Sequence, residues 1–137
     1  MAQLLELAAL ASYPELEELG RISRRERLEG LFATYDQPDR RWYVAEDEAG
    51  NPLGGLWVNP GMHPILEHPE AVVVAVAVLP HARQQGVARA LLAHARSEFA
   101  QEGVSNWRLF VHPDNMAARK LYEGLGYRIS TLELTLK

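Results

Sequence analysis

An unbroken apolar run, Ala71–Leu79, constrains the fold of this chain more than any other segment. A strand with one face in solvent alternates apolar and polar residues, whereas this run has no polar position. The run is also far too short to span a bilayer. We therefore predict a β-strand at the centre of a sheet that is covered on both faces.

Helical and strand patterns alternate after this run. Apolar residues recur at four-residue spacing from Val87 to Phe99, and Gly103 ends the pattern, which predicts a helix. Three further elements follow: a strand over Trp107–Val111, a helix over Met116–Leu125 that is closed at Gly126, and a last strand over Tyr127–Leu136. Strands that alternate with helices predict an α/β domain with a partly parallel central sheet.

Two helices and a hairpin are predicted before the apolar run. The segments Ser12–Glu15 and Ser23–Glu26 fit the S-x-x-E capping box, which predicts a helix start at each serine. The segments Trp42–Ala45 and Leu53–Val58 are rich in aromatic and β-branched residues, and the turn-rich residues between them predict a hairpin. The first segment, Gln3–Ala8, stays open, because its composition favours a helix while its short length before Ser12 permits an edge strand.

Composition excludes several classes of protein. A chain of 137 residues suits one domain, and 14 Lys and Arg against 18 Asp and Glu provide no basic field for nucleic acid. The absence of cysteine excludes disulfide scaffolds, thiolate metal sites and thiol nucleophiles. The five histidines lack the spacing of a zinc site, and the start Met1-Ala2-Gln3 lacks the basic region of a signal peptide. We therefore expect a cytoplasmic protein that binds neither nucleic acid nor a membrane.

The strongest local signal for chemistry is the loop between the apolar run and the following helix. Gly86 and Ala88 place small residues where the helix begins. Free N–H groups at a helix N-terminus attract anions, and glycine lets an anion approach the backbone closely. Taken alone, the loop is explained about equally well by an anion site and by a packing role for Gly86. It matches neither G-x-G-x-x-G nor G-x-x-x-x-G-K-[ST], so the dinucleotide and P-loop interpretations lose their expected glycines.

Two segments together resemble the GNAT superfamily of N-acetyltransferases. Val78-x-Pro80 followed by Arg83–Ala88 is similar to its acyl-CoA signature, [RQ]-x-x-G-x-[GA], and Asn115–Tyr127 is similar to its N-x-x-A-x-x-L-Y-x-x-x-G-[FY] segment. The order and separation of the two segments also suit the family, from about Ser12 to the end of the chain. The resemblance implies the acyl-CoA N-acyltransferase fold, a GNAT-like α/β domain over residues 1–137 with a mixed, partly parallel central sheet flanked by helices.

The resemblance also implies a site for acetyl-CoA, the acyl donor. In the family, the buried strand lies beside the pantetheine arm and the signature loop holds the pyrophosphate. Asn115 corresponds to a side chain that positions the cofactor arm, although its place at a helix start equally predicts a cap. The remaining residues implied in cofactor binding are Val76, Ala77, Val78, Gln84, Gln85, Gly86, Val87, Ala88 and Arg89.

Tyr122 corresponds to the catalytic general acid of the family. A phenol is protonated at neutral pH and can donate its proton to the departing thiolate of CoA. Without the resemblance, Tyr122 would belong to an apolar stripe with Leu121 and Leu125 and would be interpreted as a core tyrosine.

The chain departs from the family pattern at the general base. Many members carry a carboxylate on the buried strand or the next one, but Val72–Val74 and Leu109–Val111 are apolar here. The nearest candidates stand at the ends of these strands, with others in the preceding loop: Glu70 and His112, then His63, Glu67 and His68.

These observations predict an N-acetyltransferase in which a primary amine attacks the thioester directly. Backbone N–H groups near Val78 would stabilise the oxyanion. The acceptor is a small-molecule or peptide amine that the sequence does not identify, and its side of the site is either open or completed by a second copy in a homodimer. The missing carboxylate keeps a non-catalytic acyl-CoA-binding or regulatory module as an alternative, and a nucleotide-binding α/β domain is a further one.

Overall fold

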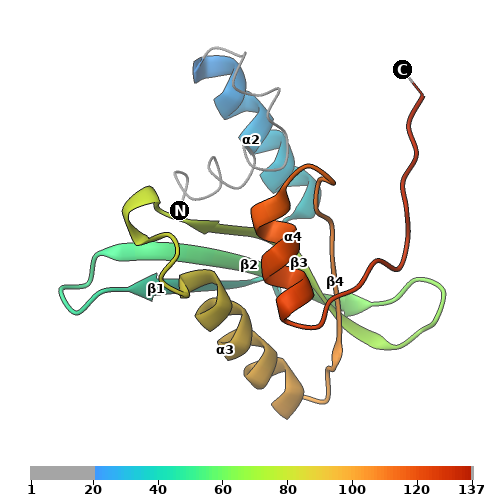
Figure 1. The fold of residues 1–137 in the computed structure, drawn as a ribbon. Helices are drawn as coiled ribbons and strands as arrows, with labels where there is room; N and C mark the ends of the chain where they lie inside the picture. The colour runs from blue at the N-terminus through green and yellow to red at the C-terminus, as the bar shows by residue number, and fades with distance from the viewer. Residues whose placement is uncertain (1–20, 137) are drawn as a thin grey trace.

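The computed structural model describes residues 21–136, with side chains from residue 26 onward. The predictions for Gln3–Ala8 and for a helix start at Ser12 lie outside the described residues. The elements are α2 (Arg21–Tyr35), β1 (Arg41–Glu46), β2 (Pro52–Met62), β3 (Pro69–Val78), the 3-10 turn η2 (Pro80–Ala82), α3 (Val87–Gln101), β4 (Asn106–Leu109) and α4 (Met116–Gly124) (Figure 1).

The described strands form one mixed sheet in the order β1-β2-β3-β4. β1 and β2 form the predicted antiparallel hairpin, and β2 continues antiparallel to β3. β3 and β4 are parallel, because α3 carries the chain back between them. The partly parallel α/β sheet expected from the sequence is therefore confirmed, with the apolar run at an interior position.

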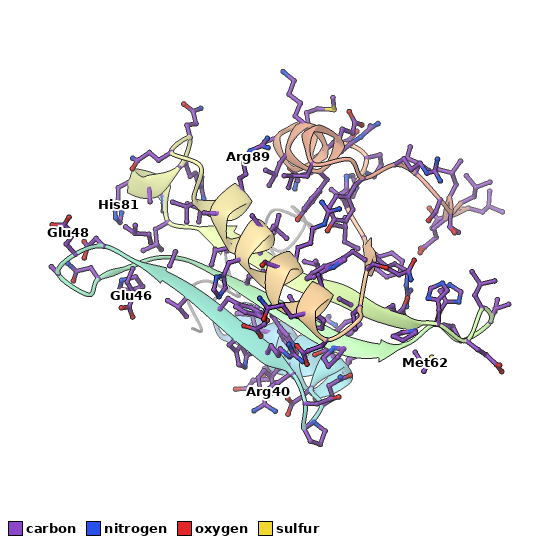
Figure 2. All side chains as sticks on the ribbon, turned by 90° about the horizontal axis from the view of Figure 1, so that it is seen from below. Arg40, Glu46, Glu48, Met62, His81 and Arg89 are labelled. Atoms are coloured by element: carbon purple, nitrogen blue, oxygen red, sulfur yellow. The ribbon has the colours of Figure 1, made fainter. Side chains whose placement is uncertain are left out.

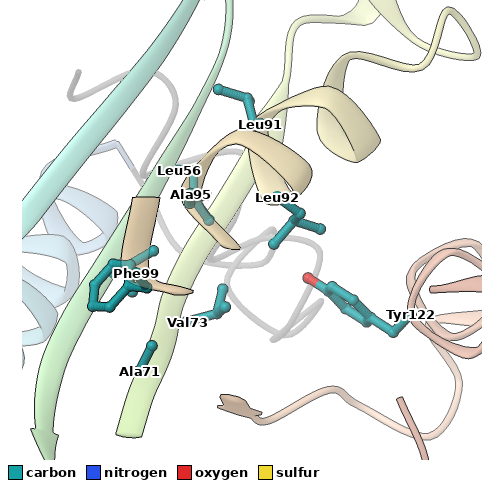
Figure 3. Close-up of a cluster of buried hydrophobic side chains, with 9 residues drawn as sticks. Leu56, Ala71, Val73, Leu91, Leu92, Ala95, Phe99 and Tyr122 are labelled. Carbon is teal, nitrogen blue, oxygen red and sulfur yellow. The ribbon is translucent and has the colours of Figure 1, made fainter. Parts of the chain in front are cut away.

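Helices cover both faces of this sheet (Figure 1). On one face, α3 and α4 pack on β2 and β3 in a core drawn in Figure 3, whose buried members are Leu56, Val58, Ala71, Val73, Leu91, Leu92, Ala95, Phe99 and Tyr122. On the other face, the Phe32 ring of α2 lies 6.5 Å from the ring of Trp42 and 5.5 Å from that of Trp57. Burial of these apolar surfaces holds the layers together.

The two glycines that were predicted to end helices do so. Gly103 follows α3 with a φ of 84°, and Gly126 follows α4 with a φ of 96°. Glycine adopts this left-handed backbone without a steric penalty, so each helix can terminate sharply. No helix in residues 21–136 is long and apolar enough to cross a membrane.

The helix start predicted at Ser23 is wrong. Arg21 is already part of α2, so Ser23 lies inside the helix instead of at its cap. A serine in a helix interior costs only a few tenths of a kcal/mol relative to the best helix formers. The arginines and glutamate that follow Ser23 favour a helix, and the capping-box pattern therefore did not decide where it begins.

The last strand predicted over Tyr127–Leu136 is also wrong. Residues 127–136 are neither helix nor strand, and they extend away from the body of the molecule (Figure 1). The side chains of Leu132, Leu134 and Leu136 are 73%, 90% and 102% exposed. A strand requires a partner to satisfy its backbone groups, and this segment has strand-like composition without a neighbouring strand among the described residues.

Candidate functional site

The two parallel strands pair over only part of the length of β3. Glu70–Val73 pair with Asn106–Leu109, and β3 then continues as Val74–Val78 without a partner on the β4 side in the described part of the chain. On its other side, β3 stays paired with β2 as far as Val78. The structure therefore leaves one edge of Val74–Val78 available for a ligand.

A β-bulge marks the point where β3 leaves β4. Val73 lies opposite Val58 and Ala75 lies opposite Trp57, so Val74 is an extra residue on β3. Bulges bend a strand and interrupt its ladder. The bend therefore coincides with the end of the pairing between β3 and β4.

The backbone of Val76 and Val78 faces the unpaired edge. The N–H of Leu79 donates to the carbonyl oxygen of Leu53 on the β2 side at 2.9 Å. Backbone groups of alternate strand residues point to opposite sides, so those of Val78 and Val76 point away from β2. Arg83 agrees with this orientation, because its Nε donates to the carbonyl oxygen of Val78 at 3.2 Å. The motif that contains Arg83 gives no sign of this link between the loop and the strand.

The loop at the end of β3 turns sharply before α3 begins. Gln84 and Gly86 both have a positive φ, 63° and 79°, and Gly86 is the N-cap of α3. A Cβ atom built on Gly86 would meet nothing within 4 Å. The backbone angle therefore explains the glycine, whereas close packing does not, and the space outside Gly86 is open.

The first turn of α3 presents free donors to that open space. The N–H of Ala90 donates to the carbonyl oxygen of Gly86 at 2.9 Å, but the N–H groups of Val87, Ala88 and Arg89 have no acceptor among the described residues. The positive end of the helix dipole lies at the same place. Arg89 adds an exposed cation beside Gly124 of α4, and Figure 2 shows it between the two helices. This arrangement favours a phosphate group.

Tyr122 projects from α4 into the core. Its side chain is 6% exposed, and Figure 3 shows its hydroxyl directed away from α4 toward Leu92 and Val73. The ring meets the Tyr127 ring edge-on, with centroids 5.6 Å apart. Burial raises the pKa of Tyr122 well above its ordinary value, because the charged phenolate would lose its hydration. The phenol is therefore protonated throughout the neutral range.

Asn115 caps α4. Its Oδ1 accepts a hydrogen bond from the N–H of Ala118 at 3.2 Å. The cap fixes the start of the helix that carries Tyr122, so the structural explanation for Asn115 is confirmed. Its role toward a cofactor stays a prediction.

Glu70 is held in an ion pair at the far end of β3. Arg108 donates to its carboxylate through Nη2 at 2.7 Å and Nε at 3.3 Å, and these bonds hold the pKa of Glu70 below its usual range. Glu70 lies six residues before Val76, which is about 20 Å along a strand. A general base must lie within hydrogen-bond reach of its proton, so this geometry favours a structural role for Glu70.

The histidine candidates are also engaged. Nδ1 of His112 accepts from the N–H of Asp114 at 3.1 Å, and Nδ1 of His63 accepts from two backbone N–H groups at 3.2 and 3.0 Å. A neutral ring with an accepting Nδ1 carries its proton on Nε2 and has no second lone pair to offer. His68 and the exposed Glu67 lie in the loop before Glu70. No three acidic or histidine side chains of residues 21–136 are arranged to hold a metal ion.

A second groove lies between β1 and α3. It is lined by Trp42, Tyr43, Val44, Ala45, Ala90, Leu91 and His94. The Tyr43 hydroxyl donates to Glu98 at 2.9 Å, and burial together with that carboxylate raises the pKa of Tyr43 to about 12. The hydroxyl of Tyr43 in this groove is therefore already hydrogen-bonded, whereas the N–H groups at the start of α3 are free within residues 21–136.

Comparisons with known proteins show which family and fold the chain resembles. A family model described as "Acetyltransferase (GNAT) family" matches residues 3–127. A putative acetyl transferase from Pyrococcus furiosus is 26% identical, with a TM-score of 0.84, and the match covers 98% of this chain and 91% of that one. No curated protein matches the chain significantly.

Two more distant structures share the fold. A ribosomal-protein-alanine N-acetyltransferase from Brucella melitensis is 20% identical, with a TM-score of 0.67, over 99% of this chain and 94% of that one. AAC(6')-Iy, solved in complex with the bisubstrate analogue CoA-S-monomethyl-acetylneamine, is 16% identical, with a TM-score of 0.67, over 99% and 90% of the two chains.

Proposed function

The chain belongs to the GNAT family of acetyltransferases, and from this membership we propose that it transfers an acetyl group from acetyl-CoA to a primary amine. The observation that carries the proposal is the unpaired edge of Val74–Val78, which residues 79–86 connect to the free N–H groups at the start of α3. The strand edge can pair with a chain of amides, and the N-terminus of α3 can bind a pyrophosphate.

The residues present fit acetyl-CoA. Val76 and Val78 can pair with the pantetheine amides as a neighbouring strand would, and Val87–Arg89 can donate to the pyrophosphate. The open space over Gly86 admits the phosphates, and the exposed side chain of Arg89 adds positive charge. Gln84 and Gln85 belong to the same loop. The backbone of Ala77 points toward β2, so Ala77 contributes to the site by holding Val76 and Val78 in position.

Acetyl-CoA supplies an activated acyl group whose carbonyl carbon an amine can attack. As the new C–N bond forms, negative charge would develop on the carbonyl oxygen, and a backbone N–H of β3 near Val76 or Val78 would donate to it. Tyr122 would give its hydroxyl proton to the departing sulfur as the C–S bond breaks, and the proton shed by the new amide nitrogen would return to the phenolate. The raised pKa of Tyr122 keeps that proton available.

The acceptor amine must reach the site without its proton. Among residues 21–136, the candidate bases nearest in sequence lie far along β3 or have Nδ1 engaged in hydrogen bonds. We therefore assign no general base and expect the amine to react from its neutral fraction. AAC(6')-Iy was solved with the bisubstrate analogue CoA-S-monomethyl-acetylneamine, and another neighbour is a ribosomal-protein-alanine N-acetyltransferase, so small-molecule and peptide amines are both candidate acceptors.

Release of free CoA thiol from acetyl-CoA, measured across a broad panel of amines, tests the proposal. We expect tight saturable binding of CoA and amine-dependent thiol release with at least one acceptor. Binding of CoA without turnover on any amine would favour the non-catalytic acyl-CoA-binding module, which the absent base suggests. Displacement of CoA by nucleotides instead of by acyl-CoA esters would point to a nucleotide-binding domain.

A further inference from the structure

The helix that carries Tyr122 ends in a Schellman motif. The N–H of Tyr127 donates to the carbonyl oxygen of Tyr122 at 2.9 Å, and the N–H of Gly126 donates to that of Glu123 at 3.1 Å. Gly126 supplies the left-handed backbone that this turn requires, with a φ of 96°. The end of α4 therefore fixes Tyr127 against the last turn of the helix, where Tyr122 lies.

The side chains of the two tyrosines complete the motif. In a Schellman motif, an apolar contact commonly joins the residue after the glycine to the residue whose carbonyl group it caps. Here that contact is between two aromatic rings, whose centroids lie 5.6 Å apart at an interplanar angle of 61°. Edge-to-face packing favours one relative orientation of two rings. The Tyr127 ring therefore restricts the orientation of the Tyr122 ring.

Packing alone orients the hydroxyl of Tyr122 within residues 21–136. It makes no hydrogen bond to another residue of that range, and burial, followed by the presence of Tyr127, raises its pKa. Figure 3 shows the hydroxyl directed toward the apolar side chains of Leu92 and Val73. A hydroxyl without a hydrogen-bonding anchor depends on the contacts of its ring for its position.

Tyr127 is itself held between α4 and α3. Its side chain is half-buried and packs against the core cluster. Burial raises the pKa of Tyr127, and the positive charge of Arg96 on α3 opposes this rise, which places Arg96 near the Tyr127 hydroxyl. Tyr127 therefore joins the end of α4 to the helix whose first turn offers free N–H groups.

We propose that Tyr127 is a positioning residue, whose ring holds the hydroxyl of Tyr122 where the departing sulfur receives its proton. A general acid must lie within hydrogen-bond reach of the atom that it protonates, and a misplacement of about 1 Å can cost as much as 100-fold in rate. The inference rests on the proposed function, because it requires Tyr122 to be the acid. The ring of Tyr127 carries this role, and its hydroxyl does not.

α3 ends in the same motif and offers a matched control. The N–H of Val104 donates to the carbonyl oxygen of Phe99 at 3.0 Å, around Gly103 with a φ of 84°. Neither Phe99 nor Val104 has a side chain that could transfer a proton. Val104→Ala therefore truncates the matching position and reports what loss of this contact does to the fold alone.

Steady-state kinetics in two backgrounds separate positioning from general packing. Tyr127→Phe keeps the ring and should keep the wild-type kcat. Tyr127→Ala should lower kcat about tenfold and leave the KM for acetyl-CoA nearly unchanged. In the Tyr122→Phe background, Tyr127→Ala should change kcat by less than about twofold, because the hydroxyl that it positions is gone.

Three kinetic results would overturn the proposal: an unchanged kcat in Tyr127→Ala, an equal loss in both backgrounds, or an equal loss in Val104→Ala. Tyr127→Leu retains an apolar contact without the aromatic ring, so its kcat should lie between those of Tyr127→Phe and Tyr127→Ala. It replaces Tyr127→Ala in both backgrounds if circular dichroism shows that the alanine variant does not fold.

Nuclear magnetic resonance provides a readout that needs no turnover. In protein with ¹³C-labelled tyrosine rings, the Tyr122 signal is the one that disappears in Tyr122→Phe. Its titration midpoint at alkaline pH should fall in Tyr127→Ala, because a displaced hydroxyl gains contact with water, and should stay unchanged in Val104→Ala. An unchanged midpoint in Tyr127→Ala would contradict the proposal. If no amine gives turnover, the proposed function fails, and this titration still decides whether Tyr127 holds the Tyr122 ring.

Discussion

At single positions, backbone angle and burial assign roles that residue type alone leaves open. Gly86 is a glycine because its φ of 79° is left-handed, and the open space around it is what a ligand can use. Tyr122 combines a core position with a hydroxyl, so the core and acid interpretations of the sequence describe the same side chain. At Tyr122, a packing role and the proposed acid role are therefore compatible.

Gly86→Glu should abolish CoA binding. The carboxylate would fill the space over the α3 N-terminus and repel the pyrophosphate, while the positive φ adds roughly 1–2 kcal/mol of backbone strain. Titration calorimetry with CoA measures the effect. Gly103→Glu is the matched control, because it has a φ of 84° with open space and lies at the other end of α3. Equal CoA affinity in the two variants would show that the loop does not hold the cofactor.

Tyr122→Phe should lower kcat by about 100-fold and leave CoA affinity nearly unchanged. The hydroxyl is asked to protonate a departing thiolate, which is already a tolerable leaving group, so the loss should lie near the lower end for general acid catalysis. The ring keeps its contact with Tyr127, so the variant should fold. Steady-state kinetics that return the wild-type kcat, with acetyl transfer rate-limiting, would leave Tyr122 with a packing role alone.

At the level of elements, the sequence predicted the helices and strands of the central region well because each is coded locally. The apolar run of β3, the four-residue spacing of α3 and the glycines after α3 and α4 all lie inside the element that they specify. Pairing is different, since the place where β3 parts from β4 depends on two segments far apart in the chain. The bulge at Val74 and the link from Arg83 to Val78 therefore had no local signal.

Glu70 and Arg108 tie the paired ends of β3 and β4 together. We expect Glu70→Gln to lower the free energy of unfolding by about 1–2 kcal/mol at neutral pH, less than a fully buried pair because Arg108 is partly exposed. The pKa of Glu70 is lowered by folding, so its stabilisation exists above the unfolded pKa and is lost as pH falls through the folded pKa.

Urea unfolding of wild type and Glu70→Gln at pH 7 and at pH 3 measures this difference. The gap between the two proteins should shrink at the lower pH. The variant should also retain wild-type kcat, and a loss of 100-fold or more in kcat with normal stability would instead make Glu70 the general base.

On the scale of the whole molecule, the ends of the chain are where local patterns predicted least. Ser23 carries a capping pattern inside a continuous helix, and the strand pattern of Leu132–Leu136 has no partner within residues 21–136. Both failures have one cause. Whether a helix cap or a strand forms depends on backbone partners that lie outside the segment carrying the pattern. The helices and strands at the centre of the domain, each specified by its own residues, were predicted correctly, but the point where β3 parts from β4 was not.

The pH dependence of turnover reports on the complete site. Because we assign no general base, we expect only the neutral fraction of an amine of pKa about 10 to react, and that fraction grows tenfold per pH unit below the pKa. We expect kcat/KM to rise about tenfold per unit from pH 6 to pH 9, while the raised pKa of Tyr122 keeps the acid protonated. A plateau above an inflection between pH 4 and 7 would reveal a carboxylate or histidine base.

Amide hydrogen exchange with and without acetyl-CoA tests most directly the claim that the unpaired edge of β3 and the start of α3 hold the cofactor. We predict slower exchange for peptides that contain Val76 and Val78, because their N–H groups gain acceptors, and for Val87–Arg89, whose free donors meet the pyrophosphate. Residues 42–45 of β1, beside the second groove, should exchange as before. Protection at β1 and the facing side of α3, with no change at Val76 and Val78, would contradict the account.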